Sequence, residues 1–243
     1  MTNHSDLRLG KLPRRNDPRT LVAAKYLRAP LPSPPPACDW LEAVASFPMY
    51  GNDVHGDCAI AAIGHMVQVW SANNHQPVVP DVNEILRVYQ ILSPNDQGCV
   101  LLDVLKYWRQ NPICGDQLGA FAEVNPSDLN EVKVCLEIFG GLYAGAMLPL
   151  TAQTQDVWSV VAGPEGQPGS WGGHCFPYGQ YDSARTGLVT WGEKKYSTWA
   201  WNLKYVDELY ALISPDWLDG TGKTPEGLDI VQLQADLDAV TGK

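Results

Sequence analysis

The chain has 243 residues, 45% of them hydrophobic, and its 27 acidic residues outnumber 17 basic ones to give a formal net charge of −10. This hydrophobic content predicts a globular protein that buries a sizeable core, as one large domain or two small ones. The acidic balance argues against a nucleic-acid-binding body, which needs basic surface to neutralise phosphates, and no stretch approaches the ~18 apolar residues of a membrane-spanning helix.

Residues 1–37 form a basic, proline-rich arm. They carry seven basic and two acidic residues, a balance of +5 that leaves −15 on the rest of the chain. The prolines between Pro30 and Pro36 favour an extended, polyproline-like backbone. We expect the arm to pack as a strap across the acidic body, and contact with nucleic acid or an anionic membrane is the disfavoured alternative. Whether it is a strap, a plug or a propeptide stays open.

The sequence predicts a cytoplasmic protein with reduced thiols. The first residues are polar, and no apolar segment of a secretory signal follows them. The six cysteines lack any C-x-x-C pair, so a structural zinc site of the usual spacing is not expected. Zinc held by His55, Cys58, His174 and Cys175 is disfavoured, because adjacent residues of a strand point to opposite faces. We therefore expect no metal and no organic cofactor.

Residues 38–118 are expected to form a helical lobe. Apolar residues recur at helical spacing over 58–72, 82–92 and 100–110, and in the last range they form a wide apolar stripe. A further short helix is predicted over 128–139, where residues 125–128, Asn-Pro-Ser-Asp, are a turn or cap that leads into it. This last helix already belongs to the next region, residues 119–218.

Residues 119–218 are expected to form a β-rich lobe, and residues 219–243 a tail with a short amphipathic helix. Strands are predicted where apolar runs of strand length are bounded by Gly, Pro, Asp and Lys turns. A helical half followed by a strand-rich half predicts an α+β fold with a cleft between the two halves. The predicted strands are 142–150, 174–181, 187–191, 196–201 and 208–213.

Cys58 stands at the start of the first predicted helix, directly after Asp57, a candidate N-cap residue. Unpaired backbone N–H groups and the helix dipole favour a thiolate at this position, which makes Cys58 a candidate nucleophile. His174 opens a predicted strand and is the candidate base. The side-chain amide of Asn52 and the Cys58 backbone N–H are candidate donors to an oxyanion.

The spacing of these residues resembles that of the papain-like cysteine peptidases. Asp39-Trp40 is similar to a pair near the start of that domain, and Asn52 follows Trp40 by 12 residues and precedes Cys58 by six. The family has its oxyanion-hole glutamine and its nucleophile at this double spacing. The resemblance therefore implies that Asn52 and Cys58 take these two roles.

The second half of the chain carries matching segments. Residues 173–176, Gly-His-Cys-Phe, resemble the histidine strand of the family, and 189–192, Val-Thr-Trp-Gly, resemble the segment with its orienting asparagine and shielding tryptophan. Residues 95–99 are similar to the glycine-rich segment that pairs with extended substrates. The resemblance implies that Thr190 orients His174. It also implies substrate-contacting positions at Gly98, Gly173, Cys175 and Trp191.

The chain departs from the family pattern at three points. The segment 55–59, His-Gly-Asp-Cys-Ala, lacks the family's upstream cysteine and therefore its disulfide, which fits a reducing compartment. Asn52 is one methylene shorter than glutamine, so its loop has to approach the thiol more closely. Thr190 stands where the family has asparagine, and its hydroxyl accepts an imidazole N–H without the strength of an amide. Asp182 is an outside candidate for the orienting role.

The resemblance covers about residues 38–213 and identifies the chain as a divergent, bacterial or phage-type member of the papain-like family. It implies a helical left lobe, an antiparallel β-rich right lobe and an active-site cleft between them. It also implies a cysteine hydrolase that cleaves amide bonds of a peptide or protein substrate through a Cys58–His174 acyl-enzyme. The alternatives are a catalytically weak or inactive module that binds a peptide or protein partner, and an acyl-transfer or ligase variant. The oligomeric state is not predicted.

Overall fold

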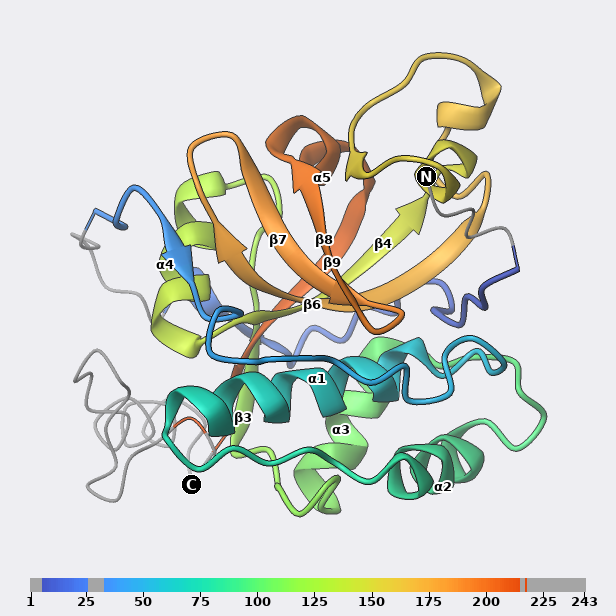
Figure 1. Cartoon of the computed structure of the whole chain (residues 1–243), viewed down its shortest axis with the longest axis vertical. Coiled ribbons are helices and arrows are strands. Elements are labelled where there is room, and N and C mark those ends of the chain that lie inside the picture. The colour runs from blue at the N-terminus through green and yellow to red at the C-terminus, as the bar shows by residue number, and fades with distance from the viewer. Residues whose placement is uncertain (1–5, 26–32, 215–216, 218–243) are drawn as a thin grey trace.

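The computed structural model describes residues 6–25, 33–214 and 217. Three helices lie together in one half of the molecule, and the strands form a curved sheet in the other (Figure 1). The predicted α+β fold class is confirmed. The helices are α1 (Cys58–Asn73), α2 (Val82–Leu92), α3 (Leu101–Gln110), α4 (Leu129–Phe139) and α5 (Trp199–Tyr205), with 3₁₀ turns at Ala23–Lys25, Leu150–Gln153 and Pro164–Gly166.

The sheet is mostly antiparallel and follows the order β1-β3-β9-β4-β6-β7-β8-β5, with β2 paired to β6. Two of its pairs, β1 with β3 and β5 with β8, are parallel. The strands are β1 (Leu21–Val22), β2 (Cys38–Asp39), β3 (Ala120–Glu123), β4 (Leu142–Leu148), β5 (Val157–Trp158), β6 (Gly172–Tyr181), β7 (Arg185–Thr190), β8 (Glu193–Thr198) and β9 (Val206–Ile213).

Helix α1 is the central helix and begins at Cys58, as predicted. Nearly all of its side chains are buried, because it packs against β6 and β7 of the sheet on one side and against α2 and α3 on the other. Asp57 does precede the helix, but its side chain makes no capping hydrogen bond. Packing, rather than a cap, therefore holds the residue that opens this helix.

The predicted helices agree with the structure to within a residue or so, whereas two predicted strands were wrong in part. The strand expected over 142–150 ends at Leu148, and Leu150 begins a 3₁₀ turn. The strand expected over 196–201 ends at Thr198, and α5 begins at Trp199. The Thr198 hydroxyl accepts a hydrogen bond from the Trp201 backbone N–H and caps this helix. The two-residue strands and β3 were not predicted, since such short segments carry almost no periodic signal. The helix predicted within 219–243 lies outside the described residues.

The centre of the sheet aligns three residues that matter below. Gly145 on β4 is paired with Cys175 on β6 on one side and with Glu208 on β9 on the other. Adjacent strands lie roughly 4.8 Å apart, so these residues form a short row across the sheet. Cys175 is the end of the row that meets the start of α1.

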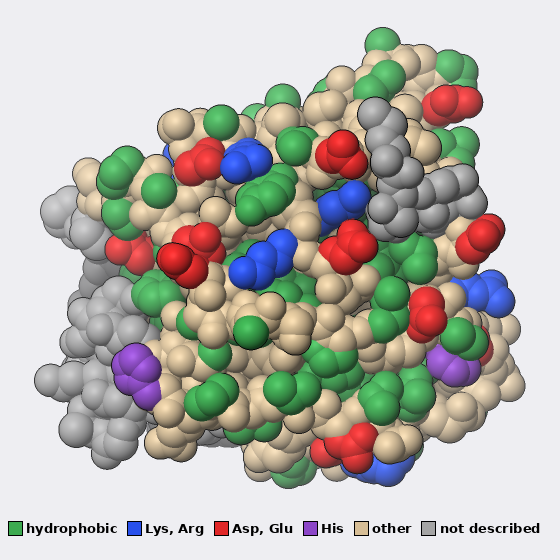
Figure 2. All heavy atoms as spheres, viewed as in Figure 1, with side chains coloured by type: hydrophobic (Ala, Val, Ile, Leu, Met, Phe, Trp, Pro, Cys, Tyr) green, Lys and Arg blue, Asp and Glu red, His purple; other side chains and the backbone are tan. Residues whose placement is uncertain are grey.

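Tryptophan fills much of the core. Trp158 stacks on Trp201 with ring centroids 4.9 Å apart, and Trp70 stacks on Trp108 at 6.1 Å. All four are fully buried. On the face shown in Figure 2, acidic and basic side chains are interspersed and no continuous basic area appears. No helix in the described part of the chain is long and apolar enough to cross a membrane.

Candidate active site

His174 is held in place from two sides. Its Nε2 lies 2.6 Å from Oγ1 of Thr190, the last residue of β7. Its ring stacks on that of Trp191, with centroids 4.2 Å apart and planes 15° from parallel. All three side chains are buried. The Thr190 hydroxyl and the Trp191 ring therefore fix the orientation of the imidazole, and the catalytic roles expected for these residues stay predictions.

The other ring nitrogen of His174, Nδ1, is buried and makes no hydrogen bond to a described residue. When Nε2 donates its proton to Thr190, Nδ1 is unprotonated and is the ring's remaining acceptor. Burial lowers the pKa of His174 to about 3, so the imidazole is neutral in this state.

Cys58 opens α1 against the start of β6. The backbone N–H groups of Cys175 and Gly10 lie against its sulfur, and the residue is 1% exposed. Burial raises the pKa of the Cys58 thiol to about 12, although these N–H groups oppose the shift. The thiolate expected from the helix N-terminus is thus not the favoured form here, because removal from water outweighs the helix dipole.

The loop before Cys58 contains two buried polar side chains. The Asn52 amide donates a hydrogen bond of 3.2 Å to the His55 carbonyl, which folds the loop on itself. Its predicted oxyanion role stays a prediction. Burial raises the pKa of the Asp57 carboxyl to about 8, and neither of its oxygens makes a well-formed hydrogen bond to a described residue.

The thiol is buried because the N-terminal arm crosses it. Gly10 passes over the loop so closely that a Cβ there would lie 1.7 Å from the Gly56 carbonyl oxygen. The Trp191 indole N–H donates to the Arg8 carbonyl at 3.3 Å. The arm therefore runs past Trp191 and over Cys58, and it separates the thiol from solvent.

The arm pairs with the positions predicted to contact substrate. The Cys99 N–H donates to the Gly10 carbonyl at 2.7 Å, and the Leu12 N–H donates to the Cys99 carbonyl at 2.9 Å. Gly98, with a positive φ of 85°, sits beneath this pairing, and a Cβ on it would lie 2.1 Å from the Gly10 oxygen. On the other side, the Lys11 N–H donates to the Gly173 carbonyl at 3.1 Å. Gly98 and Gly173 thus flank the segment of residues 10–12 on its two sides.

One side chain of the arm is fully buried. Lys11 Nζ lies 2.9 Å from Asp207 Oδ2 and 2.9 Å from Glu208 Oε1, and both the Lys11 and the Glu208 side chains are 0% exposed. The Tyr210 hydroxyl donates to the other Glu208 oxygen at 3.0 Å. Burial alone would lower the pKa of Lys11, but the two carboxylates raise it above its ordinary value, so the ammonium stays charged.

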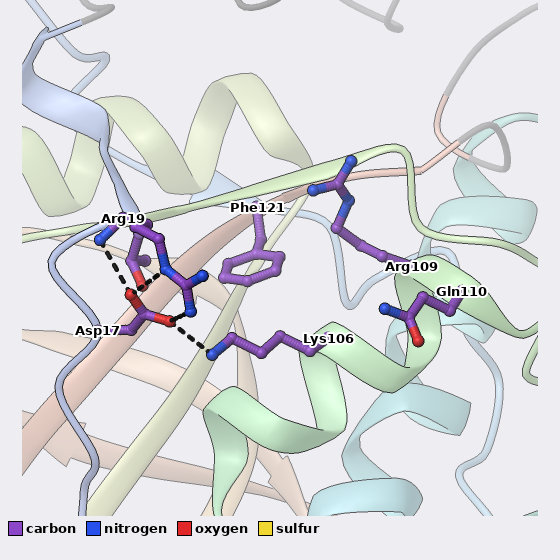
Figure 3. A pocket seen from close by; sticks show the side chains of 7 residues that line it. Asp17, Arg19, Lys106, Arg109, Gln110 and Phe121 are labelled. Atoms are coloured by element: carbon purple, nitrogen blue, oxygen red, sulfur yellow. Dashed lines mark hydrogen bonds and ion pairs between the residues drawn. The ribbon is translucent and has the colours of Figure 1, made fainter. Parts of the chain in front are cut away.

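Ion pairs attach the arm to the rest of the protein after residue 12. Arg14 pairs with Glu123, and Arg15 Nη1 lies 2.6 Å from Asp103 Oδ2. Figure 3 shows the last tether, in which Asp17 accepts from Arg19 and from Lys106 of α3 at 2.7 Å each, at the edge of a pocket lined by Phe121. These contacts are at the surface, where single pairs contribute little, about 0–1 kcal/mol each.

Two further sequence candidates lie outside this arrangement. The Asp182 carboxylate accepts from the backbone N–H groups of Ala184 and Arg185 in the β6–β7 turn, so it does not orient His174. His55 is partly exposed, with Nδ1 3.4 Å from Asp96 Oδ2. Within the described residues, no three metal-ligating side chains gather into a possible metal site.

Sequence reasoning missed the pairing of Lys11 with Asp207 and Glu208. A signal for it existed in the predicted strand over 208–213, where Glu208 shares a face with Tyr210 and Leu212 by the period of two. An acid on the inward face of a strand requires a cation or a proton. Which cation supplies it is not visible in the sequence, because the partner lies 197 residues away at position 11.

No family model and no curated protein matches the sequence. Among solved structures, xylellain, a cysteine protease from Xylella fastidiosa, matches with a TM-score of 0.65 and 13% identity, over 85% of this chain and 96% of its own. A procathepsin B from Trypanosoma congolense matches with a TM-score of 0.60 and 10% identity over 88% of each chain. A Carica candamarcensis cysteine protease matches at 0.55 and 15%, over 73% and 98% respectively. The predicted papain-like fold is confirmed, in a divergent sequence.

Proposed function

We propose that this chain, which has the papain-like fold, is a cysteine peptidase whose cleft is covered by its own N-terminal arm. The observation that carries the proposal is the buried His174, fixed by Thr190 and Trp191, whose Nδ1 has no partner among the described residues. His174 stands next to Cys175, whose backbone N–H contacts the Cys58 sulfur. A merely structural histidine would use both ring nitrogens. The extended arm over the thiol supports a peptide as the substrate class.

The reaction uses the groups of this chain alone. Cys58 Sγ attacks the carbonyl carbon of a peptide bond while its proton passes to His174 Nδ1, and the Cys58 N–H with the Asn52 amide stabilises the oxyanion. The C–N bond then breaks, and His174 returns the proton to the leaving amine. Water, deprotonated by His174, next attacks the thioester, which releases the carboxylic acid and restores the thiol.

While the arm covers them, Cys58 and His174 stay neutral and do not react. With water excluded, the ion pair of thiolate and imidazolium costs more than the neutral pair, as the shifts of both pKa values show in direction. Withdrawal of Gly10 and Lys11 would rehydrate both groups and allow proton transfer. Activity is thus coupled to the position of the arm.

Selective alkylation tests the proposal. The assay uses the full-length Lys11→Glu protein, in which a third carboxylate beside Asp207 and Glu208 expels the arm. At pH 6 an ordinary thiol is almost fully protonated, so iodoacetamide should modify Cys58 at least ~10-fold faster than the partly exposed Cys114. The same protein should cleave labelled casein.

His174→Ala is the matched control for this assay, because it removes the base and leaves the thiol. It should bring Cys58 down to the rate of Cys114. Hydrogen exchange at residues 9–12 verifies that the arm has left. If Cys58 reacts no faster than Cys114 although the arm is displaced, the chain is a binding module and not a peptidase.

Thr190→Val should lower kcat by about 10- to 100-fold with KM little changed, since valine keeps the shape and removes the oxygen that fixes the imidazole. Thr190→Ser retains the hydroxyl and should stay within about threefold of the parent. Thr190→Asn supplies the amide of the papain-like pattern and should match or exceed the parent. Initial rates on one fluorogenic peptide measure all three, and equal rates for Val and Ser would contradict the orienting role.

A further inference from the structure

The Lys11 side chain occupies a closed pocket that is built for a cation. Its anionic end is made by Glu208, fully buried, and by Asp207, 32% exposed at the side chain. Its wall includes Leu101 of α3, and its floor is Gly145 of β4. A Cβ at Gly145 would lie 2.4 Å from Lys11 Cε and 2.7 Å from Glu208 Cγ, so the absence of a side chain there makes the room.

The pairing of the strands fixes where the pocket lies relative to the Cys58 thiol. The row Glu208, Gly145, Cys175 across β9, β4 and β6 leads to the Cys175 backbone N–H, which touches the Cys58 sulfur. Gly10, the residue next to Lys11, also touches that sulfur. A peptide that lies in the cleft as the arm does would place one residue over the Cys58 sulfur, as Gly10 lies now. The side chain of the neighbouring residue would then enter the pocket, as that of Lys11 does.

An empty pocket would be unfavourable. Without Lys11, Glu208 is a buried carboxylate on an apolar strand whose Oε1 makes no hydrogen bond to a described residue. It must then be protonated, hydrated or paired with another cation. A neutral or acidic side chain cannot satisfy it, whereas lysine fits as the arm itself demonstrates, and arginine carries the same charge on a stem of similar length.

We propose that this pocket determines specificity, and that the enzyme cleaves peptides with a lysine or arginine within two residues of the broken bond. The arm is then a stand-in for such a peptide. This inference rests on the proposed peptidase function and adds the class of side chain that the cleft accepts. Glu208 is the specificity-determining residue, and Asp207 is its more exposed helper.

Cleavage of paired peptides tests the preference. Internally quenched decapeptides that differ only in lysine or norleucine at one position are given to the full-length Lys11→Glu protein, and mass spectrometry locates the broken bond. We expect kcat/KM at least ~30-fold higher for lysine within two residues of that bond, because norleucine matches the stem and lacks the charge. Equal values, or a preference for norleucine, would overturn the inference.

The Glu208→Gln variant separates recognition from folding. It should reduce the ratio of the kcat/KM values for lysine and norleucine peptides to less than about threefold. A merely structural role would lower both rates together and leave that ratio unchanged. Asp207→Asn, which alters the more exposed carboxylate, should retain most of the preference.

A binding assay keeps the test independent of catalysis. Full-length protein carrying Cys58→Ala and Lys11→Glu is titrated with a fluorescent peptide of residues 8–15, Arg-Leu-Gly-Lys-Leu-Pro-Arg-Arg, or with its norleucine version. At least ~10-fold tighter binding of the lysine peptide supports the pocket even if no peptide is cleaved, in which case the peptidase function alone fails. Equal binding overturns the pocket whatever the activity.

Discussion

Lys11→Glu is expected to raise the alkylation rate of Cys58 by about 10² to 10³ over the parent protein. Breaking a buried ion pair by removing one partner costs about 3–5 kcal/mol, and each 1.4 kcal/mol is about tenfold in the covered-to-open ratio. The substitution also adds a like charge beside Asp207 and Glu208. What remains is the backbone pairing of residues 10–12 with Cys99 and Gly173.

The measurement is the second-order rate of Cys58 modification by iodoacetamide, followed by intact mass and peptide mapping. Arg8→Glu is a matched control, since it makes the same change of charge in the same arm on an exposed side chain whose contact to Trp191 uses only the backbone. It should change the rate by less than about threefold. Parent and Lys11→Glu rates that agree would mean that the arm does not control access to the thiol.

Asp57→Asn is expected to stabilise the protein by an amount that grows with pH. The pKa of Asp57 is raised by burial from its ordinary 3.8 to about 8, so the folded state holds a proton that the unfolded state has lost. Stability contributed by the protonated carboxyl is fully present below pH about 4 and is lost as pH rises towards 8. Asparagine has the same shape and stays neutral throughout.

The free energy of unfolding of Asp57→Asn should therefore exceed that of the parent by a margin that widens by about 1.4 kcal/mol for each pH unit between pH 5 and pH 7. Urea unfolding at pH 5, 6, 7 and 8 gives the two free energies of unfolding. Asp53→Asn is the control, because it removes an exposed carboxylate from the same loop and leaves the buried Asp57 carboxyl in place, so it should not reproduce this widening. If the free energies of unfolding of the parent and of Asp57→Asn change with pH in parallel, the Asp57 carboxyl is ionised in the folded protein.

Local patterns explain why so much of the site could be predicted. Cys58 was found because α1 begins there, and a long apolar run fixes the start of a central helix. Thr190 was assigned through the resemblance of residues 189–192 to the family's segment, and its hydroxyl lies 2.6 Å from His174 Nε2. Both relations depend on one element or on two adjacent strands, which the sequence specifies through periodicity and turn length.

The covered state could not be predicted in the same way. That an arm packs on an acidic body follows from charge, but the choice of Lys11 to meet Glu208 depends on the sheet order that brings β9 beside β4. The same holds for the pKa values of Cys58 and His174, which are set by exclusion of water rather than by neighbours in the sequence. Burial of this kind is a tertiary property and has no local signature.

The tethers at Arg14, Arg15 and Asp17 have a kinetic consequence. When residues 8–12 lift off the thiol, the covalent chain keeps the segment attached, and the three ion pairs together keep its point of attachment a few residues away. A segment linked to the body this closely rebinds over the thiol at an effective concentration in the millimolar range. A free peptide with the same contacts must therefore reach millimolar levels to compete, so a substrate present at micromolar levels would be cleaved only after the tether itself has been cut or released.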